Sequence, residues 1–140
     1  MYNRYTESAR RAFFLARCQA SRLGCPSIDT EHLLFGITQE SAEAIKLHLK
    51  LDAAALREQL ATKPVSSRSA ASTDMPFDRE VQRAIAYAIK EAKHLGCKSI
   101  EAEHLLLGIM REDHCAAAKA LTTAGAPALA DVRKSISASH

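Results

Sequence analysis

Two cysteines and two histidines recur at one spacing in this sequence: Cys25 precedes His32 by seven positions, and Cys97 precedes His104 by the same distance. Two thiolates and two imidazoles could hold a zinc ion tetrahedrally, and a thiol beside an imidazole could act as a nucleophile. The spacing matches no known zinc module, and no third group that would orient a nucleophile can be assigned. We therefore predict no metal site, no cofactor and no catalytic residue, and we assign both histidines to hydrogen bonds within a helical core.

A glutamate stands directly before each of these histidines, Glu31 in the first case and Glu103 in the second. Thr30 precedes Glu31, whereas Ala102 precedes Glu103. A carboxylate in the first turn of a helix interacts favourably with the helix dipole and contributes about 0.3–1 kcal/mol. The residues alone therefore indicate helix stabilisation at both glutamates.

These repeated residues lie within a longer segment that is duplicated in the sequence. Residues 5–40 align with residues 77–112 at a constant offset of 72, without a gap, and 16 of the 36 positions are identical. The most similar part pairs LGCPSIDTEHLLFGI (23–37) with LGCKSIEAEHLLLGI (95–109), which agree at 11 of 15 positions. A duplication of this kind explains the repeated cysteine and histidine positions without any shared metal ion.

Each unit begins with a predicted helix whose apolar residues recur every three or four positions. We assign this stripe to the core, and it consists of Ala9, Ala12, Phe13, Ala16, Ala20 and Leu23 in the first unit and Val81, Ala84, Ile85, Ala88, Ala92 and Leu95 in the second. Thr6 and Asp78 are placed as N-caps, and Gly24 and Gly96 follow the last stripe residues as C-terminal glycines.

Three further helices are predicted in each unit. They begin near Asp29 and Glu101, span about 41–49 and 114–124, and run from an Asp52 cap through Leu56 and Leu60, matched by Leu129, Val132 and Ile136. We therefore predict an all-α fold of eight helices, arranged as two four-helix repeats related by a pseudo-twofold axis. Residues 1–140 form one domain, with repeat 1 at about 1–61, a linker rich in Ser, Thr and Pro at about 62–76, and repeat 2 at about 77–140.

Composition excludes several classes of protein. The net charge of +3 is spread along the chain rather than clustered, which argues against a nucleic-acid-binding protein. No run approaches the ~20 apolar residues of a membrane span, and the N-terminus lacks the apolar stretch of a signal peptide. The four cysteines are interpreted as free thiols of a cytoplasmic protein. Cys25 precedes Pro26 in a predicted loop and is expected to be exposed and open to oxidation.

The segments TEHLLFGI and AEHLLLGI, each preceded by an Ala-striped helix that ends in LG, resemble the double Clp-N motif. This motif forms the N-terminal domain of Clp-type AAA+ unfoldases, and the chain is most similar to the Clp-C and Clp-A branch. The resemblance implies a non-catalytic domain that binds protein substrates or adaptors and works with a Clp ATPase ring. Exposed apolar side chains near helix junctions are expected to line its binding groove, although the pattern does not say which ones.

The chain contains no G-x-x-x-x-G-K-[ST] phosphate loop, so we predict that it is not itself an ATPase. One alternative is a free-standing Clp-N protein that regulates the ATPase or competes with its N-terminal domain. A second alternative, from another class, is a small helical DNA-binding protein, which the interleaving of basic with acidic residues disfavours.

Resemblance to the Clp-C branch also implies a site for phosphorylated arginine. On this basis Thr30, Glu31 and Glu103 are the candidate ligand-binding residues, with the glutamates on the guanidinium group and the Thr30 hydroxyl near the phosphate. The second repeat departs from the pattern because Ala102 supplies no hydroxyl. Both repeats also carry a carboxylate, Asp29 or Glu101, at a position that is commonly Gly in that branch. Such a carboxylate would repel a phosphate and could cap the helix in its place.

Overall fold

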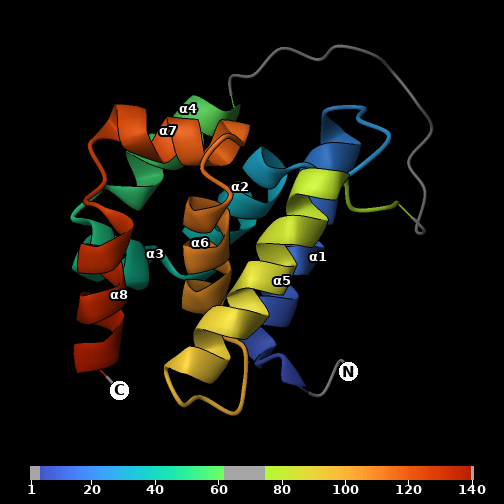
Figure 1. Cartoon of the computed structure of the whole chain (residues 1–140). Helices are drawn as coiled ribbons and strands as arrows, with labels where there is room; N and C mark the ends of the chain where they lie inside the picture. Colours follow the sequence, from blue (N-terminus) through green and yellow to red (C-terminus); the bar gives the residue numbers. More distant parts are fainter. Residues whose placement is uncertain (1–3, 62–74, 140) are drawn as a thin grey trace.

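The computed structural model describes residues 4–61 and 75–139, and nearly all of the predicted linker at 62–76 lies outside the described residues. The described chain is a bundle of helices joined by short loops (Figure 1). The elements of the first repeat are α1 (Glu7–Arg22), α2 (Thr30–Glu40), α3 (Ala42–Ala44) continued by the π-helical η2 (Ile45–Leu49), and α4 (Ala53–Ala61). Those of the second repeat are α5 (Arg79–His94), α6 (Ala102–Arg111), α7 (Ala116–Ala124) and α8 (Leu129–Ala138).

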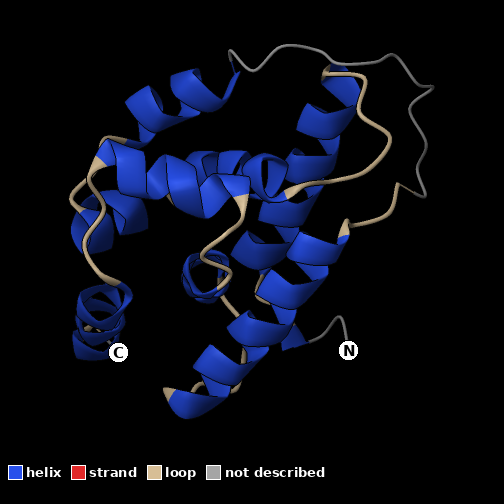
Figure 2. Cartoon of the chain, turned by 45° about the horizontal axis from the view of Figure 1, so that its top comes forward, coloured by secondary structure: helices blue, strands red, loops and turns tan. Residues whose placement is uncertain are grey.

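The predicted all-α fold of two four-helix repeats is confirmed, and Figure 2 shows how the loops join the helices. The third helix of the first repeat departs from a plain α-helix because its last five residues are π-helical. It is followed by the C-cap residue Lys50, which adopts a left-handed conformation with φ of 58°. The third helix of the second repeat, α7, is followed by the C-cap residue Gly125 with φ of 98°, where the missing Cβ removes the strain.

The predicted helix ends are also confirmed. The hydroxyl of Thr6 accepts a hydrogen bond from the Ala9 N–H at 3.3 Å, and the carboxylate of Asp78 accepts one from the Val81 N–H at 2.9 Å. Gly96 follows α5 with φ of 77°, as a C-terminal glycine should. Local sequence signals therefore place α1 and α5 at equivalent positions in the two repeats.

The segments that lead into α1 and α5 cross between the repeats. Tyr5 forms a parallel bridge with Ile100, and Phe77 forms the equivalent bridge with Ile28. The Thr6 N–H donates to the Ile100 carbonyl at 3.0 Å, and the Asp78 N–H donates to the Ile28 carbonyl at the same distance. Because both pairs obey the offset of 72, the exchange is reciprocal, as a pseudo-twofold axis requires.

The core lies between the long helices and the second helix of each repeat, and α2 and α6 occupy the middle of the bundle (Figure 1). Gly36 on α2 sits directly against the Ala12 carbonyl of α1, and Gly108 on α6 sits in the same way against the Ala84 carbonyl of α5. A Cβ at either glycine would collide with that carbonyl oxygen. The small residues therefore set how closely the helices of each pair approach.

One part of the predicted core is wrong. Most of the apolar stripe is buried, but Phe13 and Ile85 are only half-buried, and so is Leu95. Phe13 and Ile85 are equivalent residues of α1 and α5, and both face a groove on the surface. They stay partly open because the two helices pack on α2 and α6 and leave space between their outer faces.

Candidate functional site

The groove between α1 and α5 is the candidate functional site. It encloses about 590 Å³ and is lined by Tyr5, Arg10, Phe13, Phe14 and Arg17 from the first repeat and by Phe77 and Ile85 from the second. Tyr5 and Phe77 lie in the two segments that cross between the repeats. An apolar lining with a few polar or charged groups is the usual composition of a ligand-binding pocket.

The floor of this groove consists of equivalent residues, and it therefore lies on the pseudo-twofold axis. Tyr5 is equivalent to Phe77, and Phe13 is equivalent to Ile85. The rings of Tyr5 and Phe13 meet edge to face with centroids 5.4 Å apart, and those of Phe13 and Phe77 are 5.5 Å apart. This aromatic contact joins the two repeats and contributes to the packing energy of the floor.

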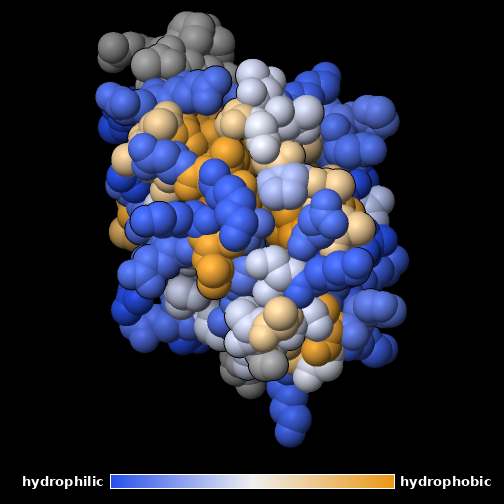
Figure 3. Space-filling view, turned by 90° about the vertical axis from the view of Figure 1, so that its left-hand side faces the viewer, coloured by the Kyte–Doolittle hydropathy of each residue, from blue (hydrophilic) through white to orange (hydrophobic). Residues whose placement is uncertain are grey.

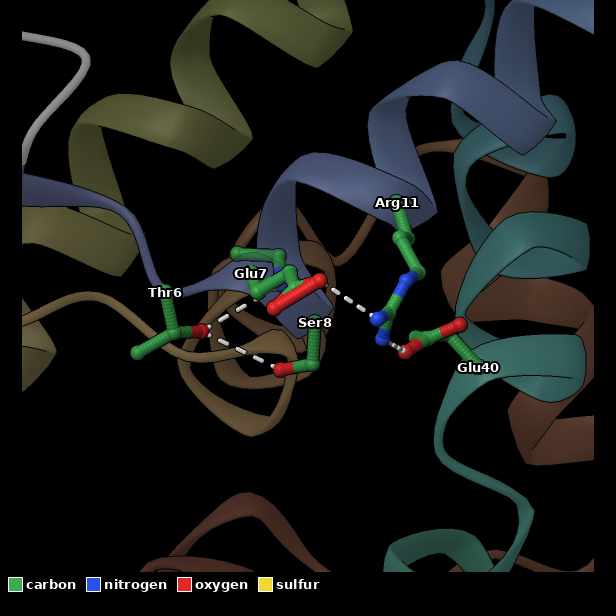
Figure 4. Close-up of polar contacts among 6 residues, drawn as sticks. Thr6, Glu7, Ser8, Arg11 and Glu40 are labelled. Atoms are coloured by element: carbon green, nitrogen blue, oxygen red, sulfur yellow. Dashed lines mark hydrogen bonds and ion pairs between the residues drawn. The ribbon is translucent and has the colours of Figure 1, made fainter.

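The rim of the groove is built from α1 and carries an exposed aromatic ring between two cations. Phe14 is 58% exposed, which is unusual for so large an apolar side chain. Arg10 and Arg17 are exposed, and neither forms an ion pair with another residue of the described chain. By contrast, Arg11 is held between Glu7 at 2.6 Å and Glu40 at 3.0 Å (Figure 4).

The face of the molecule toward α8 differs from this groove. Its apolar surface is divided into small patches by charged and polar side chains (Figure 3). The second large exposed hydrophobic residue of the described chain, Leu47, is 54% exposed, but it lies on η2 and outside the groove. Leu47 therefore serves as a comparison for Phe14, because it is exposed to a similar degree but does not adjoin the apolar floor of the groove.

The predicted ligand residues begin with Thr30, which is only 1% exposed. Its hydroxyl accepts a hydrogen bond of 3.3 Å from the backbone N–H of Ala117, in the first turn of α7 of the other repeat. Asp29 caps α2, since its carboxylate accepts from the His32 N–H at 2.9 Å. The predicted competition between Asp29 and a phosphate for these N–H groups thus has a structural basis.

The third predicted ligand residue, Glu103, lies across the repeat boundary from His48. The His48 Nε2 is 3.0 Å from a carboxylate oxygen of Glu103, and its Nδ1 is 2.7 Å from the Ser135 hydroxyl. His48 comes from the first repeat, and its side chain is 2% exposed. Glu103 thus contacts the opposite repeat, and a hollow of about 280 Å³ lies beside both residues.

Thr30 and Glu31 begin α2 of the first repeat, whereas Glu103 lies in the first turn of α6 of the second repeat. Their binding of phosphoarginine stays a prediction. Burial of the Thr30 hydroxyl and the proximity of His48 to Glu103 favour the structural interpretation of both residues.

The two repeated histidines are buried, as predicted. Nδ1 of His32 accepts a hydrogen bond from the Asp29 N–H at 3.0 Å, and Nδ1 of His104 accepts the equivalent bond from the Glu101 N–H at 2.9 Å. Each imidazole therefore stabilises the start of its own helix. No cluster of three metal-binding side chains occurs within residues 4–61 and 75–139.

The cysteines are free thiols in the structure. The expected exposure of Cys25 is wrong, because Cys25 is half-buried and its backbone N–H donates to the Ala20 carbonyl at 2.9 Å, which closes the end of α1. Cys18, on the outer face of α1, is the exposed one. Burial raises the pKa of the Cys97 thiol, and the negative charges of Glu101 and Glu103 raise it further.

Comparison with known proteins decides the family. Residues 4–124 match the family described as the Clp repeat (R) N-terminal domain. The chain belongs to the Clp N-terminal repeat family. It is 32% identical over 129 residues to the chloroplastic chaperone protein ClpC1 of Oryza sativa subsp. japonica, and equally so to a chloroplastic ClpA homologue of Brassica napus, an ATP-binding subunit of the Clp protease. In each case the alignment covers 90% of this chain but only 14% or 15% of the relative.

Solved structures agree with this membership. The N-terminal domain of ClpD from Arabidopsis thaliana superposes with a TM-score of 0.75 at 26% identity, covering 96% of this chain and 93% of that one. The Hsp104 N-terminal domain from Candida albicans has a TM-score of 0.71 at 14% identity, with coverage of 94% and 87%, and shows the fold alone. In the described part of the chain, no helix has the length and apolar character that crossing a membrane requires.

Proposed function

We propose that this Clp N-terminal repeat domain recognises proteins by binding an apolar segment of a substrate or adaptor in the groove between α1 and α5. The observation that carries the proposal is the floor of packed aromatic rings and Ile85 beside an exposed Phe14. Burying an exposed aromatic ring against a partner removes apolar surface from water and releases about 1.5–3 kcal/mol. Membership in a family of unfoldase N-terminal domains supports a role in presenting proteins to an ATPase.

The proposal assigns no chemistry to the domain itself. Its predicted partners are protein substrates or adaptors, together with a Clp ATPase that unfolds what the domain holds. The chain spans about one-seventh of the length of the relatives that it matches. Its cooperation with an ATPase is therefore proposed along with the binding.

The test uses a labelled twelve-residue peptide with Leu and Phe anchors separated by Ser and Gln, titrated with the domain by fluorescence anisotropy. We expect saturable binding. Phe14→Ser should weaken it roughly tenfold, because the variant loses the apolar area of the ring, and a tenfold change corresponds to about 1.4 kcal/mol of binding free energy. Leu47→Ser is the matched control, since Leu47 is exposed to a similar degree outside the groove. Absence of binding, or equal losses in the two variants, would contradict the proposal.

A further inference from the structure

The two walls of the groove are not equivalent, although its floor is. Arg10, Phe14 and Arg17 line the α1 wall, and all three differ in kind from the residues at the matching positions of α5, which are Gln82, Ala86 and Ile89. The α1 wall therefore has two cations and an exposed ring that the α5 wall lacks. None of the seven lining residues is acidic.

A groove on a twofold axis normally accepts a bound segment in either direction, because exchange of its two walls reverses the segment without changing the contacts. Differences between the walls remove this equivalence. Here the difference is electrostatic, and it lies wholly on the α1 side. The two orientations of a charged segment would consequently have unequal energies.

We propose that the groove binds an acidic apolar segment of a protein and holds it in one orientation, with its carboxylates toward Arg10 and Arg17. The inference rests on the proposed function and specifies the class of segment. Seven residues of helix separate the arginines, a rise of about 10.5 Å along α1. In an extended segment this distance corresponds to carboxylates about two to four residues apart, with apolar anchors beside them.

Both arginines are available for this role. Arg11, between them on the same helix, is already engaged with Glu7 and Glu40, whereas Arg10 and Arg17 form no ion pair among the residues that the structure describes. A guanidinium group presents a planar fork of donors that matches a carboxylate. Exposed ion pairs are individually weak and are screened by salt, so we expect selectivity to come from both pairs together.

The test compares three peptides that share the Leu and Phe anchors and differ in their spacers, which are acidic, neutral or basic. At low salt we expect the acidic peptide to bind roughly three- to tenfold more tightly than the neutral one, and the basic peptide more weakly than either. The advantage should shrink at 300 mM NaCl, because screening weakens exposed pairs. The double variant Arg10→Glu/Arg17→Glu should reverse the order, and Lys119→Glu/Lys134→Glu, which makes the same change in net charge on α7 and α8, is the matched control.

Orientation is tested with a nitroxide at one end of the acidic peptide and amide NMR spectra of the domain. We expect paramagnetic broadening at one end of α1 only. In the variant Arg10→Gln/Phe14→Ala/Arg17→Ile, which copies the α5 wall, broadening should appear at both ends.

The outcomes separate the two proposals. Binding of the neutral peptide that depends on Phe14 but shows no acidic preference would overturn this inference and leave the proposed function standing. Failure of all three peptides to bind would overturn both. A twelve-nucleotide single-stranded oligonucleotide is a fourth ligand to compare. If it binds more tightly than the acidic peptide and this binding is lost in the Arg10→Glu/Arg17→Glu variant, the groove binds nucleic acid and the inference is overturned.

Discussion

The two repeats share one arrangement of helices but stabilise it differently at a pair of equivalent buried residues, Gln19 on α1 and Glu91 on α5. Gln19 accepts hydrogen bonds of 3.1 and 3.0 Å from Arg22, which lies one turn further along the same helix. Glu91, 3% exposed, accepts bonds of 2.8 and 2.9 Å from Arg133 of α8 and one of 3.0 Å from Arg111 of α6. The polar residue is local in the first repeat and joins three helices in the second.

Charge is what makes this difference. Burial raises the pKa of the Glu91 carboxyl, but the hydrogen bonds and positive charges of Arg133 and Arg111 outweigh it, so the pKa lies below its usual value. Arg111 also lies over the Tyr87 ring, 4.4 Å from its centroid. A duplicated scaffold can therefore keep its backbone while one copy replaces a neutral amide with an ion-paired network.

The largest expected effect tests what the repeats have in common. Gly36→Ala and Gly108→Ala each place a methyl group against the carbonyl of Ala12 or Ala84. Overpacking of this kind costs about 1–3 kcal/mol, and we expect about 2–3 kcal/mol from each variant because the obstacle is backbone. Urea unfolding followed by circular dichroism measures the free energy of unfolding. A loss in one variant alone would show that the helix pairs are not equivalent.

Glu91→Gln tests the difference between the repeats. We expect a loss of about 2 kcal/mol at pH 7, below the range for fully buried pairs because both arginines are about one-third exposed. Since the folded pKa of Glu91 is lowered, its contribution is present above the unfolded value of about 4.3 and is lost as pH falls through the folded pKa.

The measurement is the free energy of unfolding of the unsubstituted chain and of Glu91→Gln from pH 7 to pH 3. The difference between the two should narrow below about pH 4. Gln19→Ala is the control, and its smaller effect should not vary with pH. A constant difference for Glu91→Gln across this range would mean that the ion pairs contribute little.

A smaller effect is expected at Thr30, where the repeats also differ. Thr30→Val keeps the shape of the side chain but removes the acceptor for the Ala117 N–H. A buried donor left without its partner costs about 1–2 kcal/mol. Ala102→Ser, at the equivalent position, should change stability by less than half as much. The measurement is thermal unfolding of both variants. Equal losses of stability would contradict a special role for the bond between Thr30 and Ala117.

The smallest expected effect concerns thiol reactivity in the second repeat. A chain with Cys97 as its one cysteine should react with iodoacetamide with a pH midpoint above that of the same chain in urea, because burial and two nearby carboxylates oppose the thiolate. Glu101→Gln should lower the midpoint in the folded chain. A folded midpoint at or below the urea value would contradict this electrostatic description.

Most of the fold could be predicted from the sequence, because duplication supplied two readings of each helix. Caps such as Thr6 and Asp78 act through bonds three residues away, and a local pattern reveals them. The residues that line the groove were missed because Phe13 and Ile85 continue the same apolar periodicity as the buried residues of α1 and α5. Periodicity identifies the inner face of a helix but does not tell whether another element covers its edge.

The site residues were harder to predict for a related reason. The contacts of Thr30 with Ala117 and of Glu103 with His48 span the repeats, and sequence spacing carries no information on such pairs. Asp29 was the exception, since a carboxylate at the start of a helix predicts the cap that the structure contains.

The reciprocal bridges of Tyr5 and Phe77 have a consequence for the order of folding. Tyr5 pairs with Ile100, a separation of 95 residues, so the floor of the groove needs chain from the far end of the domain. Long-range closures of this kind form late, and a ribosome adds about 5–20 residues per second. During synthesis, the helices of the first repeat can therefore form seconds before Tyr5 acquires its partner. The groove is thus one of the last parts of the domain to be completed, because its floor needs residues of the second repeat.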